Sequence, residues 1–444
     1  MDIKELYKLY QQHPCITTDS RNCPEGSIFL ALKGASFNGN QFAQAALEKG
    51  CAYAIVDEKE YQTDERIILV DNCLQTFKDL AREHRRQFDI PVIGITGTNG
   101  KTTTKELIRA VLAECYHVMA TEGNFNNDVG VPKTLFRLND KHDIAVVEMG
   151  ASHPGDIKTL VETAEPTCGL ITNVGRAHLQ GFGSFEGVCR TKGELYDFLC
   201  QHECPVFVNR DNEHLMKMIG EHQKSNGQHP DIYYYGQSEA SEILIRGEVV
   251  SCAPFLKFRW REQDSDAGYQ SEWMEVQTHL IGAYNLDNML AAITVGYVND
   301  VPFEQINHAL SNYVPTNNRS QLTETATNHL VVDAYNANPS SMQAAIENFR
   351  LMEVKPKMAI LGDMRELGEV SAEEHQRVAD MLAKAGFDEV WLVGEEFMKT
   401  RCDFRKFHDV EEVKAELQRQ QPQGRYILIK GSNGIKLFQL PELL

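Results

Sequence analysis

The sequence has no run of apolar residues close to the roughly 20 that cross a membrane, and its charged start lacks the apolar core of an export signal. Its eleven cysteines show no paired spacing, which favours reduced thiols over a disulfide framework. Positive charge is also scarce, and the formal net charge of −19 argues against a general nucleic-acid or anionic-membrane partner. We therefore expect a cytoplasmic protein without a membrane span or a nucleic-acid partner. Local basic residues could still serve an anionic small molecule.

The length of 444 residues exceeds what one hydrophobic core usually supports, so two or three domains are expected. Apolar strand patterns alternate with helical patterns over residues 91–174 and again from residue 330 onward. This alternation is typical of α/β domains built on a mostly parallel sheet with helices on both faces. In residues 225–280, the alternating runs around Tyr233–Tyr235 and Trp260 are instead typical of antiparallel strands.

Two changes of pattern indicate domain boundaries. A helical segment that ends near Phe88 leads into Pro91, and residues 312–318 resemble an inter-domain linker. We therefore expect three α/β domains: a small N-terminal domain in residues 1–88, a central phosphate-loop domain in residues 89–312, and a Rossmann-like C-terminal domain in residues 313–444. Ligands of such sheets bind at the carboxyl ends of strands, where several polar motifs of this chain lie.

Residues 93–104, Ile-Gly-Ile-Thr-Gly-Thr-Asn-Gly-Lys-Thr-Thr-Thr, have the pattern of a buried strand, a glycine-rich turn and a helix start. Gly97 and Gly100 permit backbone angles that side chains forbid, so N–H groups at the helix start can point at an anion. Lys101 would reach the terminal phosphates of a nucleotide, and the Thr102 hydroxyl would hold a magnesium ion. The alternative is a plain strand-to-helix connection. The Lys-Thr pair between strand and helix favours nucleotide binding.

Other strand ends carry polar side chains. Glu148 ends an apolar strand, where an acid can bind magnesium or cap a helix, and we favour the metal. His178 follows another buried strand and Lys192 comes soon after it; from the residues alone, each is either structural or catalytic. Asp333 begins the run Asp-Ala-Tyr-Asn-Ala-Asn-Pro, which forms a turn or binds a ribose or a peptide.

Further segments have two interpretations each. Arg319 is a surface cation or a phosphate clamp beside a domain hinge, and Lys430–Gly434 is a plain turn or an anion-holding turn. The acidic residues of Gly362–Glu369 could position an amine substrate, but we favour capping of the helix that begins near Ser371. Two loop motifs within residues 17–34, Thr-Thr-Asp-Ser-Arg and Ala-Leu-Lys-Gly, could together bind a diphosphate or uracil.

Taken in order, these segments resemble the Mur ligase family over almost the whole chain. The specific motifs are Thr18-Asp-Ser-Arg, Thr96-Gly-Thr-Asn-Gly-Lys-Thr, Gly123-Asn-Phe-Asn-Asn-Asp-Val-Gly-Val-Pro, Glu148-Met-Gly-Ala-Ser-His-Pro-Gly-Asp, Ala177-His-Leu-Gln-Gly-Phe-Gly-Ser, Asp333-Ala-Tyr-Asn-Ala-Asn-Pro and Gly362-Asp-Met-Arg-Glu-Leu-Gly. The last two resemble the branch that joins D-alanyl-D-alanine to UDP-N-acetylmuramoyl-tripeptide. The chain departs from the family pattern at Asn318, where glycine is usual, and at Asn433, where arginine is usual.

The resemblance implies an ATP-dependent amide ligase that works through an acyl phosphate in cytoplasmic peptidoglycan precursor synthesis. Its small-molecule substrates would be ATP, the UDP-linked tripeptide and D-Ala-D-Ala, and we expect a monomer. It also implies two magnesium ions and a carbamate on Lys192, which turns a cation into an anionic ligand. The residues implied for catalysis are Lys101, Glu148, His178 and Lys192. Those implied for the metal ions are Thr102, Glu148, His178 and Lys192.

The resemblance also implies binding roles. The residues implied for ATP are Gly97, Thr98, Asn99, Gly100, Lys101, Thr102, Thr103, Asn285, Arg319 and Asp333. Among them, Asn285 would lie on the adenine, Arg319 on the phosphates and Asp333 on the ribose. The residues implied for the other substrates are Ser20, Arg21 and Lys33 for the UDP part, Asn126 and Asn127 for the muramoyl-peptide, and Tyr335 and Asn336.

Other functions share some of these motifs. Another ligase of the superfamily would add a single amino acid or a glutamate tail. The identity of the amine that triggers ADP formation would distinguish such a ligase from one that uses D-Ala-D-Ala. A phosphate-loop switch or motor would hydrolyse ATP without amine or carboxylate, whereas a ligase would be nearly idle. A catalytically dead scaffold conflicts with the presence of Lys101, Thr102, Glu148, His178 and Lys192.

Overall fold

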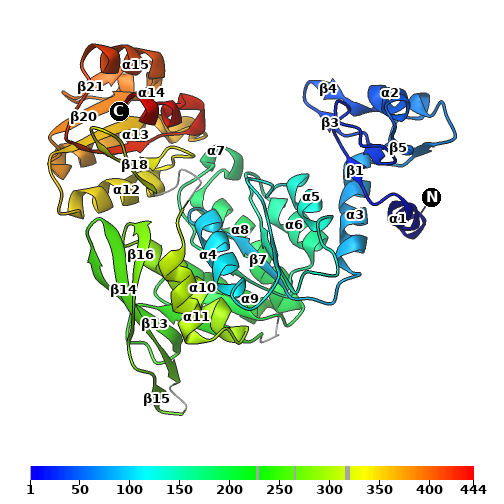
Figure 1. The fold of residues 1–444 in the computed structure, drawn as a ribbon, viewed down its shortest axis with the longest axis horizontal. Coiled ribbons are helices and arrows are strands. Elements are labelled where there is room, and N and C mark those ends of the chain that lie inside the picture. Colours follow the sequence, from blue (N-terminus) through cyan, green and yellow to red (C-terminus); the bar gives the residue numbers. More distant parts are fainter. Residues whose placement is uncertain (1, 227–229, 265–266, 316–320) are drawn as a thin grey trace. The chain divides into compact units, whose positions relative to one another are not determined.

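The computed structural model describes residues 2–226, 230–264, 267–315 and 321–444 (Figure 1). The chain divides into two compact units, and each is described by itself. Unit 1 comprises Met1–Gly94, His117–Gly150 and Lys158–Thr167, and unit 2 comprises Ile95–Tyr116, Ala151–Ile157 and Cys168–Leu444.

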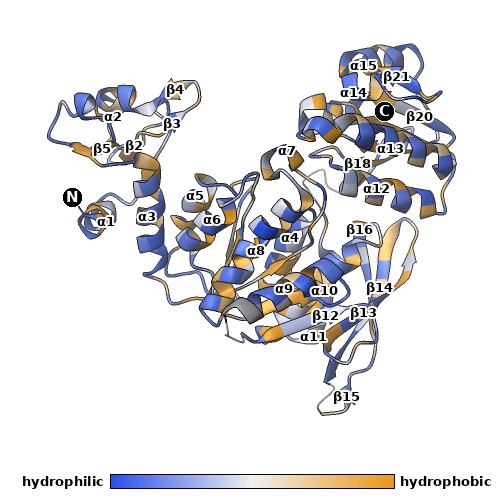
Figure 2. Ribbon diagram, turned by 180° about the vertical axis from the view of Figure 1, so that it is seen from behind, coloured by the Kyte–Doolittle hydropathy of each residue, from blue (hydrophilic) through white to orange (hydrophobic). Residues whose placement is uncertain are grey.

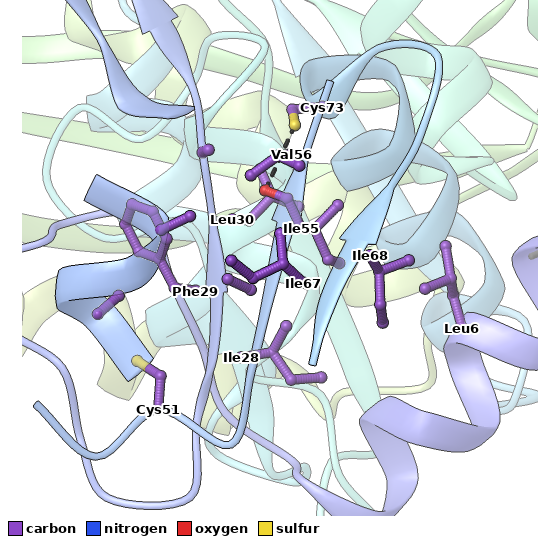
Figure 3. Close-up of a cluster of buried hydrophobic side chains, with 14 of the residues drawn as sticks. Leu6, Ile28, Phe29, Leu30, Cys51, Ile55, Val56, Ile67, Ile68 and Cys73 are labelled. Atoms are coloured by element: carbon purple, nitrogen blue, oxygen red, sulfur yellow. Dashed lines mark hydrogen bonds between the residues drawn. The ribbon is translucent and has the colours of Figure 1, made fainter. Parts of the chain in front are cut away.

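Unit 1 begins with a parallel sheet in the order β1-β2-β5-β6. Its strands are β1 (Ile16–Thr17), β2 (Ile28–Leu30), β5 (Tyr53–Val56) and β6 (Ile67–Leu69). The accompanying elements are α1 (Ile3–Gln12), the pair β3 (Lys33–Gly34) and β4 (Phe37–Asn38), η1 (Gly39–Phe42), α2 (Ala43–Glu48), η2 (Lys59–Tyr61) and α3 (Cys73–Arg85). Figure 3 shows the side chains of Ile28, Leu30 and Ile55 packed in its core. Because both faces are covered, these strands are nearly continuous apolar runs.

The rest of unit 1 holds the strands β9 (Ile144–Glu148) and β8 (Val118–Ala120), which pair in parallel, with β7 (Val92–Thr96) beside β9. The residues of β7 are shared between the two units. The helices here are α5 (Gly130–Leu135) and most of α6 (Asp156–Ala164). All five residues of β9 are buried, as the sequence of apolar residues before Glu148 predicts.

In unit 2, one sheet has the order β15-β14-β13-β12-β11-β10-β7, and β16 also pairs with β14. Its strands are β10 (Cys168–Ile171), β11 (Val206–Asn209), β12 (Ile232–Gly236), β13 (Ile243–Cys252), β14 (Phe255–Asp264), β15 (Tyr269–Gln270) and β16 (Met274–Ile281). Its helices are α4 (Lys101–Leu112), α7 (Leu179–Phe182), α8 (Phe185–Gln201), α9 (Glu213–Asn226), α10 (Asn285–Val298) and α11 (Phe303–Asn312).

The predicted antiparallel pairing is right for Trp260 in β14 but wrong for Tyr233–Tyr235. Those tyrosines lie in β12, which is parallel to both β11 and β13. The physical reason is that α9 connects β11 to β12, and a helical crossover returns the chain in the same direction. The antiparallel part begins only at the β13–β14 hairpin.

A second sheet of unit 2 has the order β17-β18-β22-β19-β20-β21, in which only β17 is antiparallel to its neighbour among the described strands. Its elements are β17 (Gln321–Glu324), β18 (His329–Asp333), α12 (Pro339–Leu351), β19 (Lys357–Gly362), η3 (Gly368–Val370), α13 (Ser371–Ala385), β20 (Glu389–Val393), α14 (Glu395–Met398), β21 (Arg405–Phe407), α15 (Val410–Arg419), β22 (Tyr426–Lys430), η4 (Asn433–Ile435), η5 (Leu437–Gln439) and η6 (Pro441–Leu443). Figure 2 shows that its strands are mainly hydrophobic while the helices carry polar faces. Successive residues of β18 belong to two different apolar clusters, because strand side chains alternate between the two faces of a sheet. Val331 packs in one cluster and Leu330 packs in the other.

These parallel sheets with helical crossovers confirm the α/β class. Among the described residues, none of the helices combines the length and the apolar character that a membrane crossing needs.

Candidate active site

The glycine-rich turn between β7 and α4 has the geometry of a phosphate loop. Gly97 and Gly100 have φ values of +144° and +80°. A Cβ atom at Gly97 would lie 2.0 Å from Thr172 Oγ1, and one at Gly100 would lie 2.7 Å from Asn288 Oδ1. Both positions therefore require glycine, for conformation and for space.

The loop is fastened to the segment that follows β10. The N–H groups of Thr98 and Asn99 donate to Asn173, at 2.9 Å to its carbonyl and 3.0 Å to its side-chain Oδ1. Lys101 Nζ donates to the carbonyl groups of Gly97 and Thr98 at 2.8 and 3.1 Å, so this cation is held over the loop. The hydroxyl-bearing residues Thr102 and Thr103 form the first turn of α4, and Thr102 is buried. The α4 N-terminus thus has a geometry that can bind an anion, with a lysine beside it.

Three basic side chains, Lys101, His178 and Lys192, influence one another and are called the basic cluster below. His178 precedes α7 with φ +49°, and its Nδ1 forms an ion pair with the Glu366 carboxylate. Burial lowers the pKa of His178, and the charges of Lys101 and Lys192 lower it further, while Glu366 opposes them. The backbone of His178 is in a region that non-glycine residues rarely adopt, which is typical of functional sites.

Lys192 lies on α8 and is 2% exposed. Burial lowers the pKa of Lys192 well below that of a free lysine, and the charge of Lys101 adds to this, against the opposing Asp156 and Glu194 carboxylates. Its Nζ lies 5.6 Å from the centre of the Phe182 ring. Within the residues that the structure describes, Lys192 forms no ion pair.

Glu148 lies in unit 1, at the end of β9, and is 1% exposed. Its Oε1 accepts a hydrogen bond from Asn126 Nδ2 at 2.8 Å, and its backbone N–H donates to Thr121 Oγ1 at 3.0 Å. The structure thus brings Glu148 and Asn126 together. Asn127 instead accepts from Gly130 N at 2.8 Å, which fixes the start of α5.

The donor chemistry of this chain fits magnesium bound together with a nucleotide. Among the described residues, no three His, Cys, Asp or Glu side chains converge to hold a metal ion by themselves. Magnesium, however, usually takes one or two carboxylates or hydroxyls and completes its shell with phosphates and water. The Thr102 hydroxyl and the Glu148 carboxylate are donors of this type, whereas an ammonium on Lys192 is not a ligand.

The residues predicted to bind adenosine are placed as follows. Asn285 starts α10 and is buried; its Nδ2 donates to Ile281 O at 2.7 Å, and its Oδ1 accepts from Asn288 Nδ2 at 2.8 Å. Asp333 ends β18, and its Oδ2 accepts from the buried Lys430 Nζ at 2.5 Å. Arg319 lies outside the described residues. The roles of these residues toward a nucleotide stay predictions.

The predicted UDP-binding residues lie in unit 1. Arg21 pairs with Asp19 at 2.9 Å and is largely exposed. Lys33 lies 3.0 Å from the carboxylates of both Asp57 and Glu58. The Ser20 carbonyl accepts from a lysine of the same unit, Lys49, at 2.6 Å. Ser20 and Arg21 lie in the loop after β1, whereas Lys33 lies in β3, and their roles toward a substrate stay predictions.

The loop between β18 and α12 carries the remaining predicted residues. Tyr335 and Asn336 are exposed, and Asn336 Oδ1 accepts from Ala337 N at 2.8 Å. Asn338, which the sequence analysis did not single out, caps α12 and donates from Nδ2 to Asn99 Oδ1 at 2.9 Å. This bond links the loop after β18 to the phosphate loop.

Two acidic residues of Gly362–Glu369 have roles that the sequence did not show. A helix does begin at Ser371, as predicted, but Asp363 does not cap it: its carboxylate accepts from Glu396 N and Phe397 N at 2.9 Å, at the start of α14. Adjacent parallel strands bring these distant segments together, since Asp363 follows β19 and α14 follows β20. Glu366 pairs with His178 across 188 positions of sequence (366 − 178), a distance over which the local pattern carries no signal.

Known protein families match most of this chain. Three family models match in order: the Mur ligase family catalytic domain over residues 14–87, the Mur ligase middle domain over residues 95–296, and the Mur ligase glutamate ligase domain over residues 318–433. The chain is 30% identical to the UDP-N-acetylmuramoyl-tripeptide–D-alanyl-D-alanine ligase of Treponema pallidum, over 97% of this chain and 93% of that protein. It is 31% identical to the protein of the same name in Bacillus subtilis, over 96% of this chain and 92% of that protein.

Solved structures are similar to this chain over nearly its whole length. MurF from Acinetobacter baumannii has a TM-score of 0.86 at 28% identity, over 98% of this chain and 97% of that one. The MurF ligase of Thermotoga maritima, solved in complex with ADP, has a TM-score of 0.83 at 26% identity, over 97% of both chains. These matches confirm the three-domain α/β architecture.

Proposed function

Because the chain belongs to the Mur ligase family, we propose that it is the ATP-dependent ligase that joins D-alanyl-D-alanine to UDP-N-acetylmuramoyl-tripeptide in peptidoglycan precursor synthesis. The relatives that match it nearly end to end carry this activity in their names. The ADP in the Thermotoga maritima structure supports ATP as the nucleotide.

The observation that carries the proposal is the basic cluster beside the phosphate loop. Lys101, His178 and Lys192 are close enough for their charges to shift the pKa values of His178 and Lys192, and Lys192 is held out of water by the fold. Such a concentration of positive charge at the carboxyl end of a sheet is costly without an anion. Phosphates and carboxylates are the anions that an acyl-phosphate ligase must bring together.

In the proposed reaction, the terminal carboxylate of the tripeptide attacks the γ-phosphorus of ATP, which gives an acyl phosphate and ADP. The D-Ala-D-Ala amine then attacks the acyl carbon, and inorganic phosphate leaves with the bonding electrons. Lys101 and the backbone N–H groups of the α4 N-terminus stabilise the charge that spreads over the transferred phosphoryl oxygens.

We propose that two magnesium ions serve this site and neutralise phosphate charge when bound. Thr102 and Glu148 would hold one of them with the β- and γ-phosphates, and Glu148, His178 and a carbamate on Lys192 would hold the other. The lowered pKa of Lys192 supports the carbamate, because only the unprotonated amine combines with carbon dioxide, releasing one proton.

The remaining assignments belong to the same proposal. Asn285 would contact the adenine, Arg319 the phosphates and Asp333 the ribose. Ser20, Arg21 and Lys33 would face the UDP part, and Asn126, Asn127, Tyr335 and Asn336 the other substrates. Residues 1–88, 89–312 and 313–444 would divide these tasks within a monomer that acts in the cytoplasm, where ATP is available.

The test is a mass-spectrometric assay of the purified protein with ATP, UDP-muramoyl-tripeptide and D-Ala-D-Ala. The expected result is the UDP-linked pentapeptide with one ADP per amide bond, and little ADP when either the tripeptide or the dipeptide is left out. ADP formation that needs neither acceptor would favour a switch or motor. ADP formation triggered by a single amino acid but not by the dipeptide would favour another branch of the family.

A further inference from the structure

Unit 2 contains a cavity of about 480 Å³ whose lining includes none of the residues assigned to the reaction above. It is lined by the segment after β10, the first turns of α8 and α9, and the helices α12 and α13. Its lining includes Arg176, Ser340, Glu374, Arg377, Val378 and Met381. The cavity therefore combines both signs of charge with an apolar wall.

Glu374 supplies a buried carboxylate to this cavity. Its side chain is 5% exposed, and its Oε1 accepts from Arg176 Nη1 at 2.8 Å. Its Oε2 is buried and has no hydrogen-bond partner among the described residues, and Arg377 Nη1 lies 3.9 Å from it. A buried carboxylate oxygen without a donor costs free energy, so this site is suited to a ligand that brings a charged N–H donor.

The rest of the lining suits a small zwitterion. Arg377 lies one turn after Glu374 on α13 and keeps about half of its side chain exposed, so its guanidinium is available to a carboxylate. Val378 and Met381 are on the same helix and offer apolar surface that fits methyl groups. An ammonium, a carboxylate and two methyl groups are what a dialanine carries.

The cavity adjoins the phosphate loop. Gly175, in its wall, donates from its N–H to Thr98 Oγ1 of the loop at 2.9 Å. The next residue, Arg176, donates from its N–H to Ser340 Oγ of α12 at 3.2 Å. A Cβ atom at Gly175 would lie 2.9 Å from Ser340 Oγ and 3.4 Å from Thr98 Cγ2, so only one residue layer separates the cavity from the loop.

We propose that this cavity binds the acceptor dipeptide, with its ammonium at Glu374, its carboxylate at Arg377 and its methyl groups on Val378 and Met381. This inference rests on the proposed function and specifies where its second substrate binds.

The first test measures the KM of each of the three substrates for Glu374→Gln, Arg377→Met and the control Glu373→Gln. Glu373 is the exposed neighbour of Glu374 on α13 and does not line the cavity. We expect the KM for D-Ala-D-Ala to rise by about tenfold or more in the two cavity variants, as for loss of a charged hydrogen bond. The KM values for ATP and the UDP-linked tripeptide should stay within about twofold, and the control should match the wild type.

The second test replaces D-Ala-D-Ala with its C-terminal amide, which keeps the amine and the methyl groups. The wild type should prefer the free acid, and Arg377→Met should lose most of that preference. Because Arg377 is half exposed, this variant keeps its fold even if Glu374→Gln does not.

Two outcomes would overturn the inference. One is an unchanged KM for the dipeptide in Arg377→Met, together with an intact preference for the acid. The other is a rise in the KM for ATP instead, which would mean that the cavity holds part of the nucleotide. In both cases the wild type would still make the amide, whereas failure of the wild type to use D-Ala-D-Ala would refute the proposed function itself.

Discussion

Two lysines of unit 2 are equally buried and have opposite surroundings. Lys430, 1% exposed, donates to Asp333 Oδ2 at 2.5 Å and to Asn336 O at 3.2 Å. Lys192, 2% exposed, forms no ion pair with any residue that the structure describes and faces the Phe182 ring. The first arrangement satisfies a buried charge, whereas the second lowers the pKa of the lysine.

These different surroundings indicate different roles for Lys430 and Lys192. A buried cation with a carboxylate partner fixes the geometry of its neighbours, here the loop that carries Tyr335 and Asn336. A buried cation without one is costly to the fold, and such groups gather where chemistry needs a perturbed group. We therefore expect Lys430 to be needed for stability and Lys192 for reaction.

The largest effect should follow from Lys192→Met, which keeps the length of the side chain but not its amine. Amide formation should fall by about 10³-fold, because the variant cannot become a carbamate. The free energy of unfolding should rise, because a buried lysine with a lowered pKa binds its proton less tightly in the folded state than in the unfolded state. That cost is greatest at low pH and shrinks as the pH rises toward the pKa of the unfolded lysine. Urea unfolding at several pH values measures it.

A labelling experiment separates the carbamate from other roles of Lys192. Wild-type protein in ¹³C-bicarbonate should show a carbamate carbon signal by NMR that Lys192→Met lacks. Lys217→Met, which removes a lysine whose side chain is 74% exposed, is the control and should keep both signal and activity. Normal turnover by Lys192→Met would show that the buried amine of Lys192 is not needed for the reaction.

Lys430→Met should have the second-largest effect, on stability. It leaves the partly buried Asp333 without its partner, which should lower the free energy of unfolding by about 3 kcal/mol. Adding Asp333→Asn should recover part of the loss, because the uncompensated charge is then gone. Lys399→Met removes an exposed lysine of an i,i+3 pair and should leave urea unfolding unchanged. Equal unfolding midpoints for Lys430→Met and Lys399→Met would contradict the structural role of Lys430.

Gly97→Ala should have a smaller effect, of about 2 kcal/mol on unfolding, with a raised KM for ATP. The new Cβ would lie 2.0 Å from Thr172 Oγ1 at a φ of +144°, so the phosphate loop must move. The matched control is Gly220→Ala in α9, where a Cβ meets nothing within 4 Å. That change should be neutral or slightly stabilising, since alanine favours a helix over glycine. A KM for ATP in Gly97→Ala equal to that of the wild type would show that the loop adapts and that its geometry does not determine ATP binding.

The phosphate loop and the strands around it could be predicted from the sequence because their signals are local. Gly97, Gly100 and Lys101 lie within one turn, and the apolar run before Glu148 gives all five residues of β9. The parallel direction of β12 was missed because its alternating pattern looks the same in either direction, and only the helix before it decides.

The partners of the site residues could not be predicted, since tertiary packing brings them together. Nothing near His178 points to Glu366, and nothing near Asp333 points to Lys430. The burial of Lys192 is likewise a property of the packed sheet and helices, because a lysine in a helical pattern is usually on the surface. The family pattern implies roles for these residues, and those roles stay predictions.

His84 is a buried basic group of unit 1, and replacing it with glutamine should give the smallest effect of these substitutions. Its Nε2 lies 3.0 Å from Leu138 O, so it carries the hydrogen, and its Nδ1 accepts from Tyr7 OH at 2.9 Å. Burial lowers the pKa of His84, so folding favours the neutral ring over the charged one. Its contribution is complete above the pKa of an unfolded histidine and is lost as the pH falls below it, by at most about 1.4 kcal/mol per pH unit. Urea unfolding at pH 7.5 and 5.5 should therefore show a shallower pH dependence for His84→Gln than for the wild type or for His153→Gln, whose histidine is exposed. An equal pH dependence of unfolding in all three proteins would mean that burial does not make protonation of the His84 ring less favourable, in contrast to the expectation for Lys192.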